Sequence, residues 1–274
     1  MTTKQAVEIR PSRGFPPLNL PELWGAREIL FILTWRDIMV RYKQTILGAA
    51  WAVLQPFMFM VVLSIFLGML AKVPSDGYPY PLFVFCGLVP WTLFAAALTI
   101  GSQSLVANEE LLTKVYFPRL LIPTASVLAA LVDLGFALLT LGVMMVFYGY
   151  LPGPEVFLLP LGLLLAMITA LAIVFWLSAL NVRYRDVRHM SLFLTTLLLY
   201  LSPIIYPVTL VPEGLRTLYG LNPIAGVVEI FKGTLLGNAV DPGLIAVSTT
   251  VAIVGFVTGW MYFSRTERSF ADVI

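Results

Sequence analysis

Residues 44–71 read QTILGAAWAVLQPFMFMVVLSIFLGMLA, and no charged side chain interrupts them. A helix rises about 1.5 Å per residue and the hydrocarbon core of a bilayer is about 30 Å thick, so roughly 20 apolar residues are enough to cross it. This stretch exceeds that length, and Lys43 and Lys72 bound it on its two sides. The sequence therefore predicts a membrane-spanning helix here.

Five further stretches have the same character. They cover residues 77–108, 120–154, 156–182, 189–212 and 242–264, and a single charged residue, Asp133, falls within them. Hydrophobic residues make up 59% of the 274-residue chain and charged residues 12%, whereas a soluble domain carries about 45–50% and about 25%. We therefore expect an all-α polytopic membrane protein with six transmembrane helices, its transmembrane domain extending over residues 45–264.

Residues 213–241 separate the last two predicted spans and are too charged to cross a membrane. The moderately apolar stretch between Asn222 and Asn238 has a length typical of re-entrant or interfacial segments. Prolines at positions 203, 207, 212 and 223 interrupt a regular helix. We expect a re-entrant helical hairpin over residues 203–238, because broken backbone is tolerated at membrane depth only where protein or water satisfies its polar groups.

The basic residues indicate the orientation. With the N-terminus inside, the inner segments hold all but three of the 17 Lys and Arg residues, the exceptions being Lys72, Arg216 and Lys232. Cytoplasmic segments of membrane proteins carry such an excess. Both termini are therefore expected in the cytoplasm, as an N-terminal arm over residues 1–28, which has no cleavable signal pattern, and a C-terminal tail over residues 265–274.

Residues 29–44 precede the first predicted span and form an amphipathic pattern. Aromatic and aliphatic residues recur there at helical spacing, and Asp37 and Arg41 lie four residues apart, where they can form an ion pair. Such a helix lies along the inner membrane surface. It is either a simple membrane anchor or an interface helix that also contacts a cytoplasmic partner, with candidate contacts at Trp35, Arg36, Asp37, Arg41 and Tyr42.

A short helix is predicted over residues 108–118, between the second and third spans. Asn108 suits its N-cap, while the following two glutamates and then Lys114 suit the partial charges of its two ends. Its apolar residues either rest against the membrane or dock into a groove on a soluble partner. The candidate partner-binding residues are Asn108, Glu109, Glu110, Leu112, Lys114, Tyr116 and Phe117.

Asp133 lies near the middle of the third predicted span, where a carboxylate is costly and should face the bundle interior or a cavity. It can line a pathway or pair with a polar neighbour, and the sequence favours neither. Aromatic residues on the spans can stack on sugar rings with little loss of side-chain entropy, although most of them serve packing or interfacial anchoring. The candidate channel residues are Trp51, Phe57, Phe59, Trp91, Phe94, Asp133 and Tyr200.

The sequence lacks the signatures of several other functions. It contains no G-x-x-x-x-G-K-[ST] phosphate loop, so ATP is not expected to bind this chain by that device. One cysteine, Cys86, and one histidine provide no metal-ligand spacing. A net charge of +2 does not suggest nucleic acid as a partner. We expect no catalytic residue, cofactor or metal in this chain.

Five runs of sequence together resemble one known family. They are LTWRDIMVRYKQTILGAAWAVLQP at 33–56, FCGLVPW at 85–91, LTKVYFPR at 112–119, NVRYRDV at 181–187 and YGLNP at 219–223. Each run alone is modest, but their combination resembles the ABC-2-type export permeases for polysaccharides, a family that includes O-antigen and teichoic acid exporters. The likeness extends from about residue 24 to residue 265.

The resemblance implies a homodimer with a channel between its subunits, and two copies of a separate ABC ATPase subunit that bind ATP and Mg. Residues 29–44 would be the interface helix, residues 108–118 the coupling helix, and residues 203–238 a gate on the outer side. The implied substrate is a lipid-linked polysaccharide that enters from the inner leaflet. The chain itself would be a non-catalytic, multi-pass subunit in the lipid of the inner (cytoplasmic) membrane.

Other functions stay open at this point. The same scaffold could export a smaller lipid or a drug. An intramembrane enzyme would need paired carboxylates or a metal set at one depth, which the sequence lacks. An ion channel would be expected to conduct without an ATP-binding partner.

Overall fold

The computed structural model describes residues 20–43, 48–115, 117–267 and 270. Within these ranges the chain is helical and has no strand. The expected N-terminal arm and C-terminal tail lie largely outside the described residues, as do the end of the predicted helix at 29–44 and Tyr116. The location of the two termini in the cytoplasm therefore stays a prediction.

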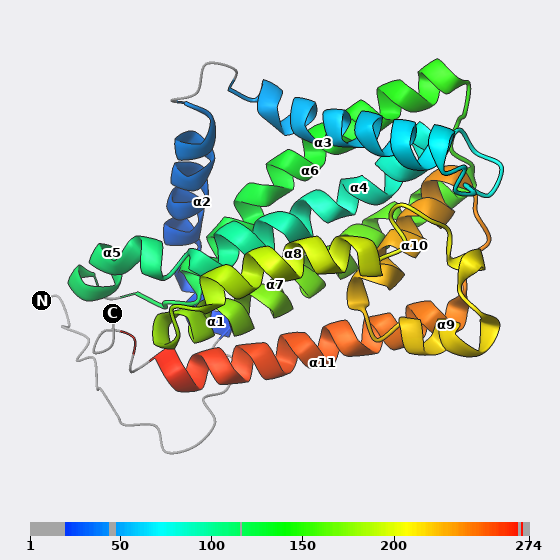
Figure 1. The fold of residues 1–274 in the computed structure, drawn as a ribbon. Coiled ribbons are helices and arrows are strands. Elements are labelled where there is room, and N and C mark those ends of the chain that lie inside the picture. The colour runs from blue at the N-terminus through cyan, green and yellow to red at the C-terminus, as the bar shows by residue number, and fades with distance from the viewer. Residues whose placement is uncertain (1–19, 44–47, 116, 268–269, 271–274) are drawn as a thin grey trace, which may run out of the picture.

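Five long apolar helices form the body of the molecule (Figure 1). They are α3 (Ala50–Leu63), α4 (Tyr80–Ala96), α6 (Leu121–Tyr148), α7 (Leu159–Arg183) and α11 (Pro242–Thr266). π-Helical turns extend α3 through η1 (Ser64–Leu70) and α4 through η2 (Ala97–Gly101), and a 3-10 turn, η4 (Pro154–Leu158), precedes α7. Each is long and apolar enough to cross a membrane. The prediction of an all-α polytopic membrane protein is confirmed.

The fifth predicted span, over residues 189–212, differs from the others. The chain forms a helix there, α8 (Val187–Leu201), but it has 15 residues, fewer than the roughly 20 that a span needs. An irregular segment with one 3-10 turn, η5 (Val208–Leu210), follows it. The count of six spans therefore stays a prediction, because α8 alone is too short to cross a membrane.

Two helices occupy the region of the expected hairpin. The first is the short α9 (Glu213–Tyr219), and the second is α10 (Pro223–Leu236), which packs against α4, α7 and α11. Asn222 caps α10 by accepting a hydrogen bond from the Ile224 amide at 3.1 Å, and Gly237 ends the helix with a positive φ. Since Figure 1 places α9 and α10 at one end of the bundle, we call this the α9 end.

The opposite end carries the other short elements, and we call it the α2 end. There α2 (Arg27–Tyr42), preceded by α1 (Leu20–Gly25), crosses the direction of the long helices, and α5 (Glu109–Lys114) lies nearby (Figure 1). The 3-10 turn η3 (Val106–Asn108) leads into α5. The interface and coupling segments expected from the sequence therefore share one end of the bundle.

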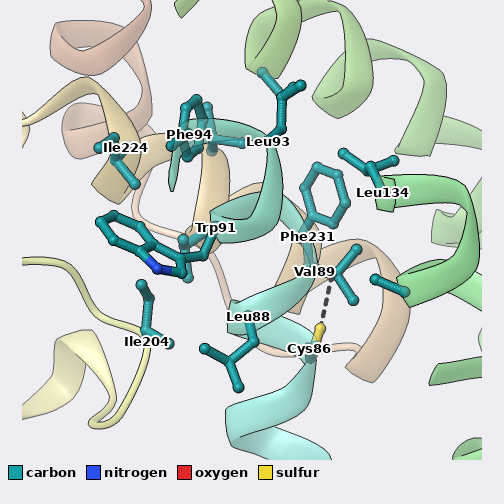
Figure 2. Close-up of a cluster of buried hydrophobic side chains, with 14 of the residues drawn as sticks. Cys86, Leu88, Val89, Trp91, Leu93, Phe94, Leu134, Ile204, Ile224 and Phe231 are labelled. Atoms are coloured by element: carbon teal, nitrogen blue, oxygen red, sulfur yellow. Dashed lines mark hydrogen bonds between the residues drawn. The ribbon is translucent and has the colours of Figure 1, made fainter. Parts of the chain in front are cut away.

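The main core surrounds α4, which packs against α3, α6, α7 and α10. Its residues are apolar on every side, as expected of a helix surrounded by others. Figure 2 shows Cys86, Val89 and Phe94 of α4 in this core together with Phe231 of α10, whose backbone carbonyl accepts a hydrogen bond from the Cys86 thiol at 3.6 Å. Cys86 is fully buried.

A second core lies at the α2 end, and we call it the basal cluster. It joins α2, α5, α6, α7 and α11 through the buried side chains of Leu33, Leu105, Leu112, Phe117, Leu120, Leu121, Ile122, Ala125, Phe175, Ala179, Phe263 and Phe270. Because apolar burial is the main attraction between these elements, the basal cluster fixes both α2 and α5 to the long helices.

Close approach of α10 to α11 depends on a glycine. A Cβ atom added at Gly226 would lie 2.3 Å from the Cβ and 2.7 Å from the Oγ of Ser248 on α11. Ser248 is fully buried and its hydroxyl donates to the Gly220 carbonyl at 2.9 Å, so it has no room to move aside. The close packing of α10 on α11 therefore requires a glycine at position 226.

We predict that Gly226→Ala lowers the stability of the detergent-purified protein by about 1–3 kcal/mol, the usual cost of over-packing. Thermal unfolding measures the effect. Gly142→Ala is the matched control, since a Cβ atom at Gly142 on α6 meets nothing within 4 Å. Equal melting temperatures for the two variants would contradict the tight contact of α10 with α11.

Candidate functional site

α2 presents an aromatic face away from the bundle. Phe31 and Trp35 are exposed and stack with ring centroids 6.5 Å apart, whereas Leu33 is buried in the basal cluster. This arrangement suits a helix at a membrane interface, where amphipathic rings gather. Among the candidate contacts of the interface helix, Trp35 is thus exposed and Arg36 is partly exposed.

The expected ion pair between Asp37 and Arg41 is not formed. Asp37 instead pairs with its neighbour Arg36, with Arg36 Nη2 lying 2.7 Å from Asp37 Oδ1. Arg41 turns toward α6, where it forms an ion pair with Asp133. The Asp37–Arg41 pair that the spacing allows is therefore absent, and Arg41 instead pairs with a partly buried partner far along the chain.

Asp133 receives two donors from the C-terminal turn of α2. Its Oδ2 atom accepts from the Arg41 guanidinium, and its Oδ1 atom accepts from the Tyr42 hydroxyl. The ring of Tyr42 also packs edge-on against Phe136 of α6, with centroids 6.3 Å apart. Burial, and then the neighbouring Asp133 carboxylate, raise the pKa of Tyr42 above its ordinary value, so this hydroxyl stays protonated and donates. Of the two roles open to Asp133, the structure shows the polar partner.

α5 divides into an exposed and a buried side. Glu109, Glu110 and Lys114 are exposed, and Lys114 Nζ lies 3.2 Å from Glu110 Oε2 as an (i, i+4) ion pair. Leu112 is only 4% exposed because it belongs to the basal cluster, as does Phe117. These two predicted partner contacts therefore anchor the segment within this chain, and the charged residues are the ones presented to the outside.

Asn108 occupies the N-cap position of α5, as predicted, but its side chain does not cap the helix. Its side-chain amide donates backwards to the Ser104 carbonyl at 2.7 Å, and it makes no side-chain hydrogen bond to the first turn of α5. The helix itself spans six residues and ends at Lys114, four residues before Pro118. The prediction is therefore right in the position of the N-cap, but the side chain bonds to the Ser104 carbonyl ahead of the 3-10 turn and not to the first turn of α5.

The candidate channel aromatics fall into two groups. Trp51, Phe57 and Phe59 on α3 and Tyr200 on α8 are exposed on the surface of the chain. Figure 2 shows Trp91 and Phe94 packed inside the main core, where they are 7% and 0% exposed. Trp91 and Phe94 are thus enclosed by helices of this chain, whereas the other four rings are open on its surface.

Lys232 has a position that the sequence analysis missed. It was counted among the outer basic residues, yet its side chain is 2% exposed on α10. Its ammonium group donates to the Pro203 carbonyl at 2.6 Å and to the Ile204 carbonyl at 3.3 Å, and lies 3.3 Å from the centroid of the Phe83 ring. In the sequence, the apolar neighbours of Lys232 in the run VVEIFKGTLL were the feature that could have indicated its burial.

Other side chains satisfy further carbonyls where α8 ends. The Tyr219 hydroxyl donates to the Leu201 carbonyl at 2.6 Å, and the Asn222 amide reaches the same oxygen at 3.3 Å. The Tyr206 hydroxyl donates to the Tyr200 carbonyl at 3.0 Å, and the Tyr80 hydroxyl donates to Ile205 at 2.8 Å. With Lys232, these donors form what we call the α8 cap. They allow non-helical backbone to lie among apolar helices.

The loop between α3 and α4 closes over this region. Asp76 accepts from the Thr209 hydroxyl at 3.0 Å and from the Asn238 amide at 3.3 Å. The Tyr78 hydroxyl donates to the Leu236 carbonyl, and its ring lies 5.5 Å from that of Tyr150. The segment after α8 and the end of α10 are thus held to the rest of the α9 end.

Among the described residues, no group of three or more His, Cys, Asp or Glu side chains could hold a metal ion. Glu229 is a buried acidic residue of α10, one turn before Lys232.

Comparison with known proteins gives a consistent result. The family model described as ABC-2 type transporter matches residues 28–236. The chain is 29% identical over 257 residues to the O-antigen export system permease protein RfbA of Myxococcus xanthus, covering 92% of this chain and 98% of that protein. A protein of the same name from Klebsiella pneumoniae is 29% identical over 251 residues, covering 90% and 95%.

A more distant relative is named for a different cargo. The polysialic acid transport protein KpsM of Escherichia coli is 22% identical over 249 residues, covering 88% of this chain and 93% of that protein. These proteins therefore match nearly the whole chain.

We predict that Lys232→Met destabilises the protein by about 1–3 kcal/mol, the cost of leaving buried polar groups unsatisfied. The reason is that the Pro203 and Ile204 carbonyls lose their donor. Thermal unfolding and protease sensitivity of the purified protein measure the effect. Lys72→Met is the control, because Lys72 is an exposed lysine of the α3–α4 loop. If both variants unfold like the wild type, Lys232 does not hold the α8 cap.

Proposed function

Because the chain belongs to the ABC-2 type transporter family, we propose that it is the membrane-spanning subunit of an exporter that moves lipid-linked polysaccharide across the cytoplasmic membrane. The observation that carries this proposal is the family match over most of the chain, together with relatives that are named for O-antigen and polysialic acid transport. These relatives align along nearly their full length, which supports a cargo of the same chemical class.

ATP hydrolysis is assigned to a separate ABC ATPase subunit, present in two copies, which binds ATP and Mg. The α2 end is the docking side in this proposal. It carries α5 with its exposed Glu109, Glu110 and Lys114, and it carries α2 with the exposed Trp35. Charged groups at the rim of an interface set orientation and association, so these residues suit a contact with a soluble partner.

The polysaccharide path is assigned to the interface of a homodimer. α3 is the least buried of the five long helices, and α8 also leaves an apolar face exposed. Trp51, Phe57 and Phe59 lie on α3, and Tyr200 lies on α8. Aromatic rings on these two helices could stack on sugar faces between two copies of the chain.

The α2 end is assigned to the cytoplasmic side. Most of the Lys and Arg residues belong to segments at this end, whereas Lys72, Arg216 and Lys232 belong to segments at the α9 end. This distribution follows the positive-inside rule. The domain organisation proposed is an interface helix at 29–44, a coupling segment at 108–118 and an outer gate at 203–238 within the transmembrane domain 45–264.

Motion of the ATPase would enter the bundle through two segments. α5 leads into α6 after a short connection, and the basal cluster ties α5 to α6, α7 and α11. Since packed cores transmit displacement rather than absorb it, movement of α5 would shift the long helices. That shift would open the path between the two copies.

We predict that the double charge reversal Glu110→Lys with Lys114→Glu lowers stimulation of the partner ATPase at least about tenfold, a loss of about 1.4 kcal/mol in coupling. The reversed pair keeps the (i, i+4) attraction within α5, so the helix itself is retained. ATP hydrolysis by the reconstituted complex, with and without lipid-linked glycan, measures the effect.

The matched control is Lys72→Glu, a charge reversal at the α9 end. It should leave stimulation unchanged, and membrane insertion of all variants should equal that of the wild type. Normal stimulation in the doubly reversed variant would reject α5 as the coupling segment. Export of a small lipid or drug, but not of the glycan, would reject the proposed substrate.

We also predict that Trp51→Ala and Tyr200→Ala each slow glycan export several-fold, since burying the apolar area of one such side chain contributes about 1.5–3 kcal/mol. Flux of glycan in proteoliposomes measures the effect. Phe147→Ala is the control, because Phe147 is an exposed ring on α6, a helix outside the pair proposed to line the path. Equal export by all three variants would place the path elsewhere.

A further inference from the structure

The contact between α2 and α6 contains an ion pair within apolar surroundings. Arg41 and Asp133 are each about one-fifth exposed in their side chains, and they are 92 residues apart in the sequence. An unpaired carboxylate at the centre of a membrane helix costs about 2.5–3.5 kcal/mol. The pair therefore strongly favours the arrangement in which the last turn of α2 lies against α6.

The position of Asp133 along α6 matters as much as its charge. α6 begins at Leu121, so Asp133 lies about three turns into the helix. Leu33 of α2 reaches the basal cluster, while Arg41 and Tyr42 reach Asp133. α2 is thus fixed to the bundle near its middle by apolar packing and at its C-terminal turn by a charged contact.

Both oxygens of the Asp133 carboxylate are engaged by α2. Arg41 occupies Oδ2 and Tyr42 occupies Oδ1, and the Tyr42 ring also packs on Phe136, one turn further along α6. A carboxylate held in this way is poorly placed to contact a passing substrate. Its geometry instead suits a contact that holds α2 against α6.

We propose that Asp133 is a positioning residue that locks α2 onto α6, so that the two helices move as one rigid unit when the ATPase partner acts. The inference rests on the proposed function for its mechanical consequence. α6 then receives motion at two places, from α5 at its N-terminus and from α2 at Asp133. An ATPase contact on either segment displaces the same helix.

The test compares single and paired neutral variants. Asp133→Asn leaves the Arg41 charge without its partner, which is strongly destabilising in a buried setting. The double variant Arg41→Gln with Asp133→Asn leaves no unpaired charge, so it should still fold and insert. The control is Lys72→Gln with Glu155→Gln, which removes the same two charges from exposed residues toward the α9 end.

Two measurements are made on each protein. Hydrogen–deuterium exchange of α2 in the purified chain, without any ATPase, reports the lock itself. Glycan exported per ATP hydrolysed in proteoliposomes with the ATPase reports its consequence. In the double neutral variant we expect α2 to exchange faster and export per ATP to fall at least about fivefold, the lower end of typical coupling between sites. The control should match the wild type in both.

Each outcome decides between roles. Wild-type exchange in the double neutral variant would overturn the proposal, and so would faster exchange with wild-type export per ATP, which would leave the pair a purely structural contact. Unchanged exchange with a raised KM for glycan would also overturn it, because Asp133 would then contact substrate. If the wild type shows no ATP-driven export at all, the proposed function fails, while the exchange measurement still tests the lock.

Discussion

The satisfaction of backbone polar groups away from water is the constraint on which the rest of the structure depends. The five long helices meet it internally, since their amides and carbonyls bond within each helix. α8 ends after 15 residues and leaves carbonyls that other elements must satisfy. Tyr219, Asn222 and Lys232 supply donors, so α9 and α10 are held against α8 by necessity as well as by packing.

The long helices could be predicted from the sequence because a charge is so costly in hydrocarbon that its absence over roughly 20 residues is informative. The absence of charge could not locate the end of α8, since residues 189–212 are also uncharged, and only Pro203 indicated a break there. The donors that the carbonyls at this break require come from Lys232 and Tyr219, which become neighbours of Leu201 and Pro203 only in the folded protein.

The sequence predicted which segments form the candidate site, but it predicted fewer of the contacts that their side chains make. Helical periodicity located α2 and the short α5, but it could not tell that Leu112 faces inward or that Arg41 prefers Asp133 to Asp37. Trp91 and Phe94 illustrate the same limit. α4 is apolar all round, so no polar face marks which of its aromatics meet other helices and which meet lipid.

The enclosed thiol of Cys86 makes the chain convenient for site-directed labelling. A maleimide or a spin label needs solvent access to the sulfur, and Cys86 is fully buried against Phe231. In the folded state the only native cysteine therefore does not react with such reagents. A cysteine introduced at an exposed position of α2 or α5 would be the sole reactive group, so probes can be attached there without first removing a native residue.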